Sequence, residues 1–329
     1  MDLSPLHFGC SIDRPSDRIR KSPRWDDEEG VASTIGTIMS LMVFLTAMGM
    51  FTNQFVPVWM SDNESAHMST VIQQFVTMKS QIDGVIADNA NSLVAPTPLF
   101  APITLSAPGI PVFAGPTAGV LAFHPKSTYD RPSFNVSFEA EGYSLGPLND
   151  GHSGGDIDLY CPNRYYIEQH VAYENGAVIV NQTDGEFIIA GIQLSVSNYI
   201  AGTETSRVVK LTQISMMGQN KTLGGMGSKG VNIDLMYADT SVYNSTLGSD
   251  IVITIVSAHG YAWSTFFETA LNNTFSDLTY GTDFTVSRTL YDFTGYVHDY
   301  YITTVTIKDV NIFDHTHATV QVTLGELGI

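Results

Sequence analysis

The sequence is poor in charge and in cysteine. Charged residues make up only 15% of its 329 positions, and the two cysteines are Cys10 and Cys161. Two cysteines cannot form the disulfide framework that stabilises many secreted domains. Because they flank a long apolar segment, we expect them on opposite sides of a membrane and unpaired, with Cys161 a buried, small apolar residue.

Basic residues are also scarce. The chain has 15 Lys or Arg against 33 Asp or Glu, a formal net charge of −18, and beyond residue 29 ten basic residues face 26 acidic ones. Such a chain repels polyphosphates, which argues against nucleic-acid binding. Neither a phosphate-binding loop motif nor an internal repeat is present, and strand and helix patterns do not alternate. These absences argue against a parallel α/β domain and a repeat architecture.

One long stretch has no charge at all. No Asp, Glu, Lys or Arg occurs between Glu29 and Asp62. About 22 apolar or small residues suffice to cross a hydrocarbon layer of ~30 Å as a helix. The run is longer than the apolar core of a secretory signal. We predict a transmembrane helix over residues 30–56, and the five basic residues before it favour a cytoplasmic leader (residues 1–29) and an extracellular remainder.

A different helical pattern follows Pro57. Apolar residues recur every three or four positions through residues 57–88, as in an amphipathic helix, and Ser61 with Glu64 fits a capping box at its start. The pattern predicts a stalk helix that continues the membrane helix, with a kink at Pro57. Its apolar stripe comprises Met68, Val71, Ile72, Phe75, Met78, Ile82, Val85 and Ile86.

The rest of the chain predicts a mainly β head. Eight prolines in residues 89–132 indicate a linker with short edge strands, and residues 133–329 alternate with the period of two typical of strands. We predict an antiparallel β-sandwich, or two, crossed by one helix over 261–272. The expected strands cover residues 134–140, 156–160, 165–173, 177–181, 187–198, 205–216, 231–237, 250–258, 300–313 and 318–324.

Four short sequences predict turns between these strands, one of them Gly224-Gly225. Asn175-Gly176 and Asp184-Gly185 are dipeptides typical of hairpins, because their residues readily adopt positive φ. Leu247-Gly248-Ser249 is expected to separate two further strands.

Gly151-His152-Ser153-Gly154-Gly155 matches the G-x-S-x-G nucleophile elbow. That motif needs a strand before the serine and a helix after it, whereas a strand pattern follows here. We therefore interpret residues 151–155 as a flexible loop and expect no enzyme activity and no cofactor, with a secreted hydrolase as the least favoured class.

Two weak metal-site candidates remain. His315 and His317 share one face of an extended segment next to Asp314, a set that could bind zinc, although a solvent-facing strand end is favoured. Asp156 and Asp158, near Asn149 and Asp150, offer oxygen ligands for calcium without the spacing of a known loop.

Six N-x-[ST] sequons follow the predicted span, on the side where glycans are added. We expect about half of them to carry a glycan. Their acceptor residues are Asn63, Asn135, Asn181, Asn220, Asn244 and Asn272.

Several motifs accompany this layout of an apolar helix and a β-rich head. The apolar helix opens with Gly-Val-x-x-x-Ile-Gly-Thr from Gly30. The head carries Asn-Arg-Tyr-Tyr from Asn163, Tyr-Glu-Asn-Gly-Ala-Val-Ile from Tyr173, and Ala-Trp-x-x-Phe-Phe from Ala262. The layout and these motifs resemble archaeal type IV pilin-like membrane-anchored proteins. The resemblance implies a surface protein without catalytic residues and a leader cleavage site at Gly30–Val31.

The sequence departs from the pilin pattern in two places. Glu29 stands where the family usually has a basic residue, and Ile35 stands where many members have an acid. Because these signals are missing, we favour docking of the stalk helix on its own head, or a small membrane oligomer, over a filament.

These observations favour a non-enzymatic, membrane-anchored surface protein with a structural, adhesive or assembly role. It would associate with itself or with other pilin-like subunits through its N-terminal helix. The alternative is an extracellular glycan- or solute-binding module whose groove is lined by tyrosines. The candidate tyrosines are Tyr165, Tyr166, Tyr173, Tyr291, Tyr296, Tyr300 and Tyr301.

Overall fold

The structure is a computed structural model. The chain divides into two compact units, Met1–Asn53 and Gln54–Ile329. The structure describes residues 27–90, 96–126, 132–140, 143–146, 151–201, 204–274, 278–291 and 299–326.

The first unit holds helix α1 (Asp27–Met50). Its large apolar side chains are exposed all around the helix; Val43, for example, is 69% exposed. Among the described residues, the helical stretch that begins at Val31 is the only one long and apolar enough to cross a membrane. The possible cleavage residues Gly30 and Val31 lie within this helix.

A π-helical turn, Phe51–Phe55, separates α1 from helix α2 (Val56–Asn89). Pro57 follows at the start of α2. Proline has no N–H to donate to the residue four positions back, and its ring clashes with that carbonyl. A π-turn accommodates this defect, so the irregularity expected at Pro57 lies just before it.

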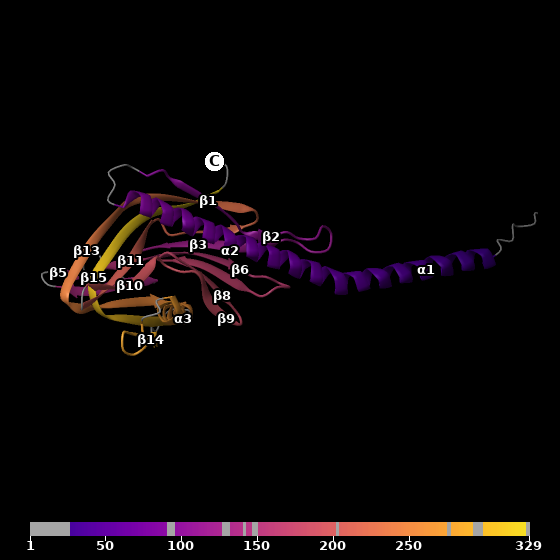
Figure 1. The fold of residues 1–329 in the computed structure, drawn as a ribbon. Coiled ribbons are helices and arrows are strands. Elements are labelled where there is room, and N and C mark those ends of the chain that lie inside the picture. Colours follow the sequence, from indigo (N-terminus) through magenta and orange to yellow (C-terminus); the bar gives the residue numbers. More distant parts are fainter. Residues whose placement is uncertain are drawn as a thin grey trace, which may run out of the picture. The chain divides into compact units, whose positions relative to one another are not determined.

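Helix α2 docks on the head through its apolar stripe. It packs against strands that include β1 (Leu99–Thr104), β7 (Gln169–Glu174) and β13 (Ser228–Ser257) (Figure 1). The amphipathic helix and its docking are therefore confirmed. Seven of its apolar side chains are buried in or packed on a shared core: Met68, Val71, Ile72, Phe75, Met78, Ile82 and Ile86.

The described strands form one connected sheet of 15 strands. Its main path runs β10-β11-β15-β13-β4-β6-β7-β8-β9. Strand pairs are antiparallel except β11 with β15, which run parallel, so the all-antiparallel prediction is wrong at that pair. The remaining strands are β2 (Ser106–Ala107), β3 (Thr117–Pro125), β4 (Ser133–Ala140), β5 (Tyr143–Leu145), β6 (His152–Cys161), β8 (Ala177–Gln182), β9 (Gly185–Ala190), β10 (Leu194–Ala201), β11 (Glu204–Gly218), β12 (Lys221–Gly225), β14 (Phe284–Tyr291) and β15 (Tyr300–Glu326).

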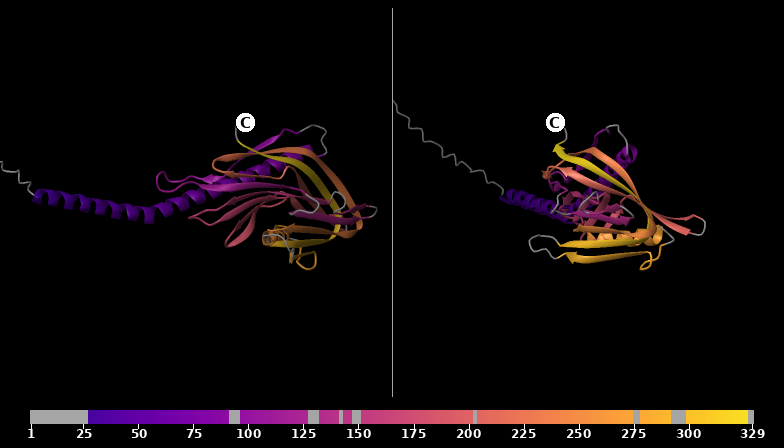
Figure 2. Two further views of the ribbon diagram at one scale, coloured as in Figure 1. Left: turned by 180° about the vertical axis from the view of Figure 1, so that it is seen from behind. Right: turned by 90° about the vertical axis from the view of Figure 1, so that its left-hand side faces the viewer.

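Two very long strands replace four predicted ones. β13 has 30 residues and β15 has 27, and they pair along most of their lengths. The expected turn at 247–249 is instead an irregularity within β13, between Asn244 and Ser249. A bulge absorbs extra residues without ending a strand and increases its bend. Both strands curve strongly (Figures 1 and 2).

Other boundaries also differ from the predictions. The expected strand 187–198 is broken into β9 and β10, and at the break Gly191 lies against the ring of Phe266, where a Cβ would clash. The strand expected over 165–173 begins only at Gln169. β3, inside the predicted linker, is a nine-residue strand between β6 and β12.

The hairpin β7–β8 lies between two hydrophobic cores. Val171, Tyr173, Val178 and Val180 face the core that α2 covers, while Ala172, Ala177 and Ile179 face a second core. The hairpin turn at Asn175-Gly176 is confirmed, with φ of 43° and 83°. The hairpin predicted at Asp184-Gly185 also forms, but its turn residues are Thr183 and Asp184, and Gly185 begins β9. Cys161 is buried in the first core, as predicted.

The second core contains helix α3 (Gly260–Thr269), continued by a π-helical turn, Ala270–Thr274. The helix predicted over 261–272 is therefore confirmed, with Trp263, Phe267 and Leu271 fully buried. The chain is thus a long apolar helix followed by a mainly β body with two cores.

Candidate functional site

Glu64 ties the first turns of α2 to the head. Its side chain is fully buried. The Thr117 hydroxyl donates to the carboxylate at 2.7 Å. Three successive backbone N–H groups also donate to it, at 2.8–3.1 Å: Arg164, Tyr165 and Tyr166. Consecutive N–H groups that converge on one anion form a strong binding concavity.

These donors keep Glu64 ionised. Burial alone raises the pKa of Glu64, but the hydrogen bonds from Arg164, Thr117 and the two tyrosine N–H groups outweigh burial and lower the pKa below 4.5. The capping-box prediction is therefore wrong, because Glu64 lies inside α2 and bonds to the loop between β6 and β7. Its backbone partners in that loop are about 100 residues away in sequence.

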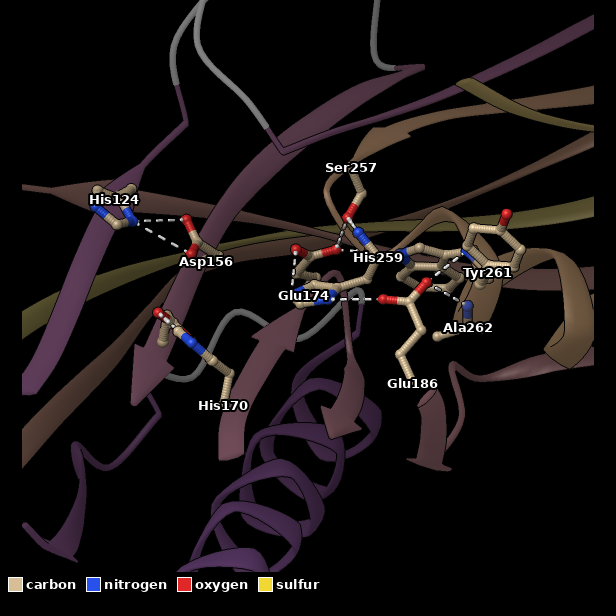
Figure 3. A network of polar contacts seen from close by, with 11 residues as sticks. His124, Asp156, His170, Glu174, Glu186, Ser257, His259, Tyr261 and Ala262 are labelled. Carbon is tan, nitrogen blue, oxygen red and sulfur yellow. Dashed lines mark hydrogen bonds and ion pairs between the residues drawn. The ribbon is translucent and has the colours of Figure 1, made fainter. Parts of the chain in front are cut away.

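A row of acids and histidines crosses β3, β6 and β7 (Figure 3). His124 lies directly opposite Asp156, and Asp156 lies directly opposite Glu174. The His124 Nδ1 atom is 3.1 Å from Asp156 Oδ1, and the His170 Nδ1 atom is 3.8 Å from Asp158 Oδ2. Burial raises the pKa of Asp156, and the bond from His124 partly offsets this.

Glu174 is the most enclosed member of this row. The Ser257 hydroxyl donates to its Oε2 at 2.8 Å, and the Trp263 indole N–H donates to the same atom at 3.0 Å. The Nε2 atom of His259 lies 3.9 Å from its Oε1. Burial raises the pKa of Glu174, and the nearby His259 works against that rise.

Glu186 completes the cluster from β9. Its Oε2 lies 3.3 Å from His259 Nδ1, and its Oε1 accepts the N–H groups of Tyr261 and Ala262 at 2.6 and 3.0 Å. A carboxylate at a helix N-terminus satisfies unpaired N–H groups and complements the helix dipole. Glu186 therefore caps α3 from another strand, because the N-cap residue, His259, makes no such side-chain bond.

His259 is a buried cation between two carboxylates. Burial alone lowers the pKa of His259, but the bond to Glu186 and the charges of Glu174 and Glu186 outweigh burial and raise it to about 9. At neutral pH the imidazolium therefore bridges β7, β9 and the start of α3. We name Glu174, Glu186, Ser257 and His259 the His259 cluster. No local sequence pattern predicts this cluster, since its residues come from three separate segments: β7, β9 and the junction of β13 with α3.

The His259 cluster is not arranged for nucleophilic catalysis. The Ser257 hydroxyl donates to Glu174 and accepts the backbone N–H of His259, so the histidine ring does not activate it. The adjoining cavity, lined by Gly154, Gly155, Glu174 and Trp263 among others, is about 10 Å³. That volume holds about one water molecule and no substrate.

The calcium candidates Asp156 and Asp158 point to the same face of β6, each beside a histidine. Within the described residues, no group of three or more His, Cys, Asp or Glu side chains is placed to hold a metal ion. The other two calcium candidates, Asn149 and Asp150, lie outside the described residues.

His315 and His317 share a face, but the favoured solvent-facing position is wrong. They are 1% and 6% exposed. His315 Nε2 lies 2.8 Å from Gln213 Oε1, and His317 Nε2 lies 3.1 Å from the hydroxyl of Ser215. Burial lowers the pKa of His315 to about 4, with a further contribution from His317. Both histidines therefore serve a buried polar layer between β11 and β15.

The apparent elbow motif is a strand and not a flexible loop. Residues 152–155 begin β6, and Ser153 is fully buried with its hydroxyl donating to Asn175 Oδ1 at 2.8 Å. A buried serine in a strand lacks the exposed, strained turn that a nucleophile elbow requires.

The six sequons fall into two groups. Asn220, Asn244 and Asn272 are exposed, whereas the other three are partly buried. Asn63 donates to the Pro108 carbonyl at 3.2 Å, and Asn135 Oδ1 lies 2.5 Å from His152 Nδ1. The third partly buried acceptor is Asn181. At Asn63 the glycan would attach to the same Nδ2 atom that donates to Pro108, in partly buried surroundings, whereas the exposed acceptors leave room for a glycan, which favours the exposed group.

The candidate tyrosines do not form one groove. Tyr173 is fully buried, Tyr166 packs on the first core, and Tyr296 lies outside the described residues. Tyr301 instead joins a surface cluster in which the Arg288 guanidinium stacks 3.3 Å from the ring centroid of Tyr261.

The comparisons with known proteins do not place the chain in a family. No family model matches it, and neither a curated protein nor a solved structure is similar to it. The resemblance to archaeal pilin-like proteins thus rests on the sequence motifs and on the layout of an apolar helix and a β-rich body.

Proposed function

We propose that this chain is a membrane-anchored surface protein with a structural, adhesive or assembly role and no catalytic activity. One observation carries the proposal: α1 exposes large apolar side chains all around its circumference and has no charge beyond Glu29. Such a surface is stable only in a membrane or against other apolar helices. The basic leader favours a cytoplasmic N-terminus and an extracellular head.

Within the described part of the chain, the buried acids and histidines discussed above have partners in the fold, and these partners join strand to strand or helix to strand. This arrangement supports a structural role for these side chains. The pilin-like layout suggests that α1 also contacts other subunits. Burial of the α2 stripe in the chain's own core leaves α1 as the segment available for such contacts and favours a small membrane assembly over a filament.

The second candidate is a glycan- or solute-binding module. The surface cluster of Tyr261, Arg288 and Tyr301 favours it, because aromatic rings stack on sugars and Tyr261 is 51% exposed. Retention on immobilised glycans should fall in Tyr261→Ala and Tyr301→Ala if this is the function. Tyr199→Ala, which removes a 64% exposed tyrosine from β10, is the matched control.

The anchoring proposal is tested by membrane extraction and protease protection. The full chain should remain in membranes washed with alkaline carbonate, whereas Leu41→Arg with Leu45→Arg should weaken retention. In intact cells, added protease should cut the head and spare an N-terminal tag. Release of the unaltered chain by carbonate would refute the anchor, and cleavage of the tag in sealed cells would refute the orientation.

Glycosylation is tested by peptide mass spectrometry of the native protein. We expect glycans at Asn220, Asn244 or Asn272, the exposed acceptors. A native protein whose mass equals the sequence mass would contradict this expectation.

A further inference from the structure

The head has a group of exposed apolar side chains near the start of α2. Phe55, Val58 and Trp59 are 48%, 57% and 46% exposed. Val112 is 99% exposed, at the tip of the loop between β2 and β3, and Tyr165 is 44% exposed in the loop between β6 and β7. We name these five residues the apolar rim.

Polar contacts hold the three segments of the apolar rim together. Asn63 on α2 donates to the carbonyl of Pro108, where the loop carrying Val112 begins. Glu64, the next residue in the chain, accepts hydrogen bonds from the backbone N–H groups of Arg164, Tyr165 and Tyr166. Figures 1 and 2 show the loop after β2 beside the early turns of α2.

The loop that carries Val112 has a defined shape. The N–H groups of Phe113 and Ala114 both donate to the carbonyl of Ile110, at 3.1 and 3.0 Å. Val112 has a φ of 74°, which is costly for a β-branched residue. The loop thus holds Val112 in a strained backbone conformation with its apolar side chain exposed. Backbone strain of this kind is more common at functional sites than elsewhere.

The apolar rim lacks the acidity of the rest of the head. Residues 89–125 contain no Asp, Glu, Lys or Arg, although the chain as a whole carries a net charge of −18. The segment that runs into α2 is likewise uncharged up to Asp62. Two of the three segments are therefore uncharged, and the third carries Arg164, exposed beside Tyr165, so contact with an apolar phase involves little desolvation of charge.

Chain length places the apolar rim close to any membrane that holds α1. Trp59 follows Met50, the last residue of α1, by nine positions. Nine helical residues span about 14 Å, and the predicted transmembrane helix continues to residue 56, so Trp59 follows its end by about 5 Å, within the interfacial layer of about 5–8 Å on each side of the hydrocarbon core. Tryptophan and tyrosine are enriched in those layers because their rings are apolar and their N–H or O–H groups are polar.

We propose that the apolar rim inserts into the headgroup region of the membrane that holds α1. The partner is a lipid surface and not a second protein. This inference rests on the proposed membrane anchor, and it adds a second contact that would hold the head against the bilayer.

Site-specific fluorescence quenching in the full-length protein tests this inference. A Cys10→Ser background leaves only Cys161, which is 1% exposed, so a thiol label reacts with an introduced cysteine. Labels are placed by Val112→Cys in the apolar rim, by Phe44→Cys in α1, and by Leu247→Cys as the matched control. Leu247 is an equally apolar residue with 90% exposure in the middle of β13.

Each variant is reconstituted in phosphatidylcholine vesicles with plain or brominated acyl chains. The labels at positions 44 and 112 should lose fluorescence in brominated vesicles, and the label at 247 should not. If only position 44 is quenched, the rim inference is wrong and the anchor stands. If neither is quenched, the anchor itself fails.

Iodide in the aqueous phase separates lipid from protein contact. A label at position 112 that is shielded from iodide but not quenched by brominated lipid would lie against protein, and this would overturn the proposal. We expect shielding from iodide together with quenching by bromine at position 112, and full iodide quenching at position 247.

Discussion

Two buried glutamates attach the two helices of the head to the sheet, and they do so in different ways. Glu64 extends from α2 into a loop of the sheet and is held by backbone N–H groups and one hydroxyl. Glu174 extends from β7 towards α3 and faces a protonated histidine, with Ser257 and Trp263 as donors. One carboxylate has fixed dipoles around it, whereas the other has a titratable partner.

The difference predicts opposite responses to pH. The pKa of Glu64 is lowered in the fold. Its contribution to the stability of the fold is therefore complete above pH 4.5 and is lost as the pH falls through the pKa of the folded state. The pKa of His259 is raised to about 9. Its contribution to the stability of the fold is therefore complete below pH 6.5 and is lost as the pH rises through 9. The attachment of α2 should therefore weaken in acid and that of α3 in alkali.

The largest effect is expected when α2 loses the apolar contact that positions Glu64. Phe75→Asp with Ile82→Asp replaces two fully buried side chains by charges, and each change should cost about 3 kcal/mol or more. We expect α2 to undock and protease to cut near residue 89. Gln73→Asp with Thr77→Asp, on the exposed face, is the control. Equal protease resistance of both variants would contradict docking.

Removing the charge of Glu64 should have the next largest effect. Glu64→Gln leaves buried N–H groups that converge on a partly positive amide, and we expect a loss of about 4 kcal/mol in the free energy of unfolding. Urea unfolding of the detergent-solubilised chain at pH 7 measures it, with exposed Asp62→Asn as the control. Equal losses in the two variants would show that the Glu64 contacts contribute nothing specific.

The third prediction concerns the pH dependence of the His259 cluster. The shift of the His259 pKa from 6.5 to about 9 corresponds to roughly 3 kcal/mol of stability that is lost between those pH values. Unfolding followed by tryptophan fluorescence should show this loss in a background with Trp25→Phe and Trp59→Phe, which leaves Trp263 as the only tryptophan. His259→Gln should have a lower free energy of unfolding at pH 6 than the parent, and that free energy should fall less as the pH is raised. His170→Gln, at a partly exposed histidine, should behave like the parent, and identical slopes in all three chains would refute the assignment.

The smallest effect is expected from Ser257→Ala. This change removes one of the two hydrogen-bond donors to Glu174 and should cost about 1–2 kcal/mol, because Trp263 and His259 remain. Thermal unfolding measures it against Ser264→Ala in the same region. A loss as large as that of Glu64→Gln would mean that Glu174 depends on its neutral donors more than on His259.

Local patterns predicted the elements whose signals are contained in a short window. The apolar helix, the stripe from Met68 to Ile86, the hairpin at Asn175-Gly176 and the helix with Trp263 were all predicted from residue spacing or turn chemistry. Strand limits were less predictable, because Gly248 indicates a turn in isolation but lies within a long strand once β15 pairs on both sides of it.

The sequence by itself determined that the chain joins a charge-free apolar helix to an acidic, β-rich body, since hydrophobic periodicity and charge are local properties. Only the tertiary structure decided what the buried polar residues do. The spacing of Glu64 predicted a helix cap, but its carboxylate bonds α2 to a distant loop. The pattern around His315 predicted an exposed position, but its side chain lies in a buried polar layer. A buried polar group needs partners, and the fold supplies them from residues about 100 positions away.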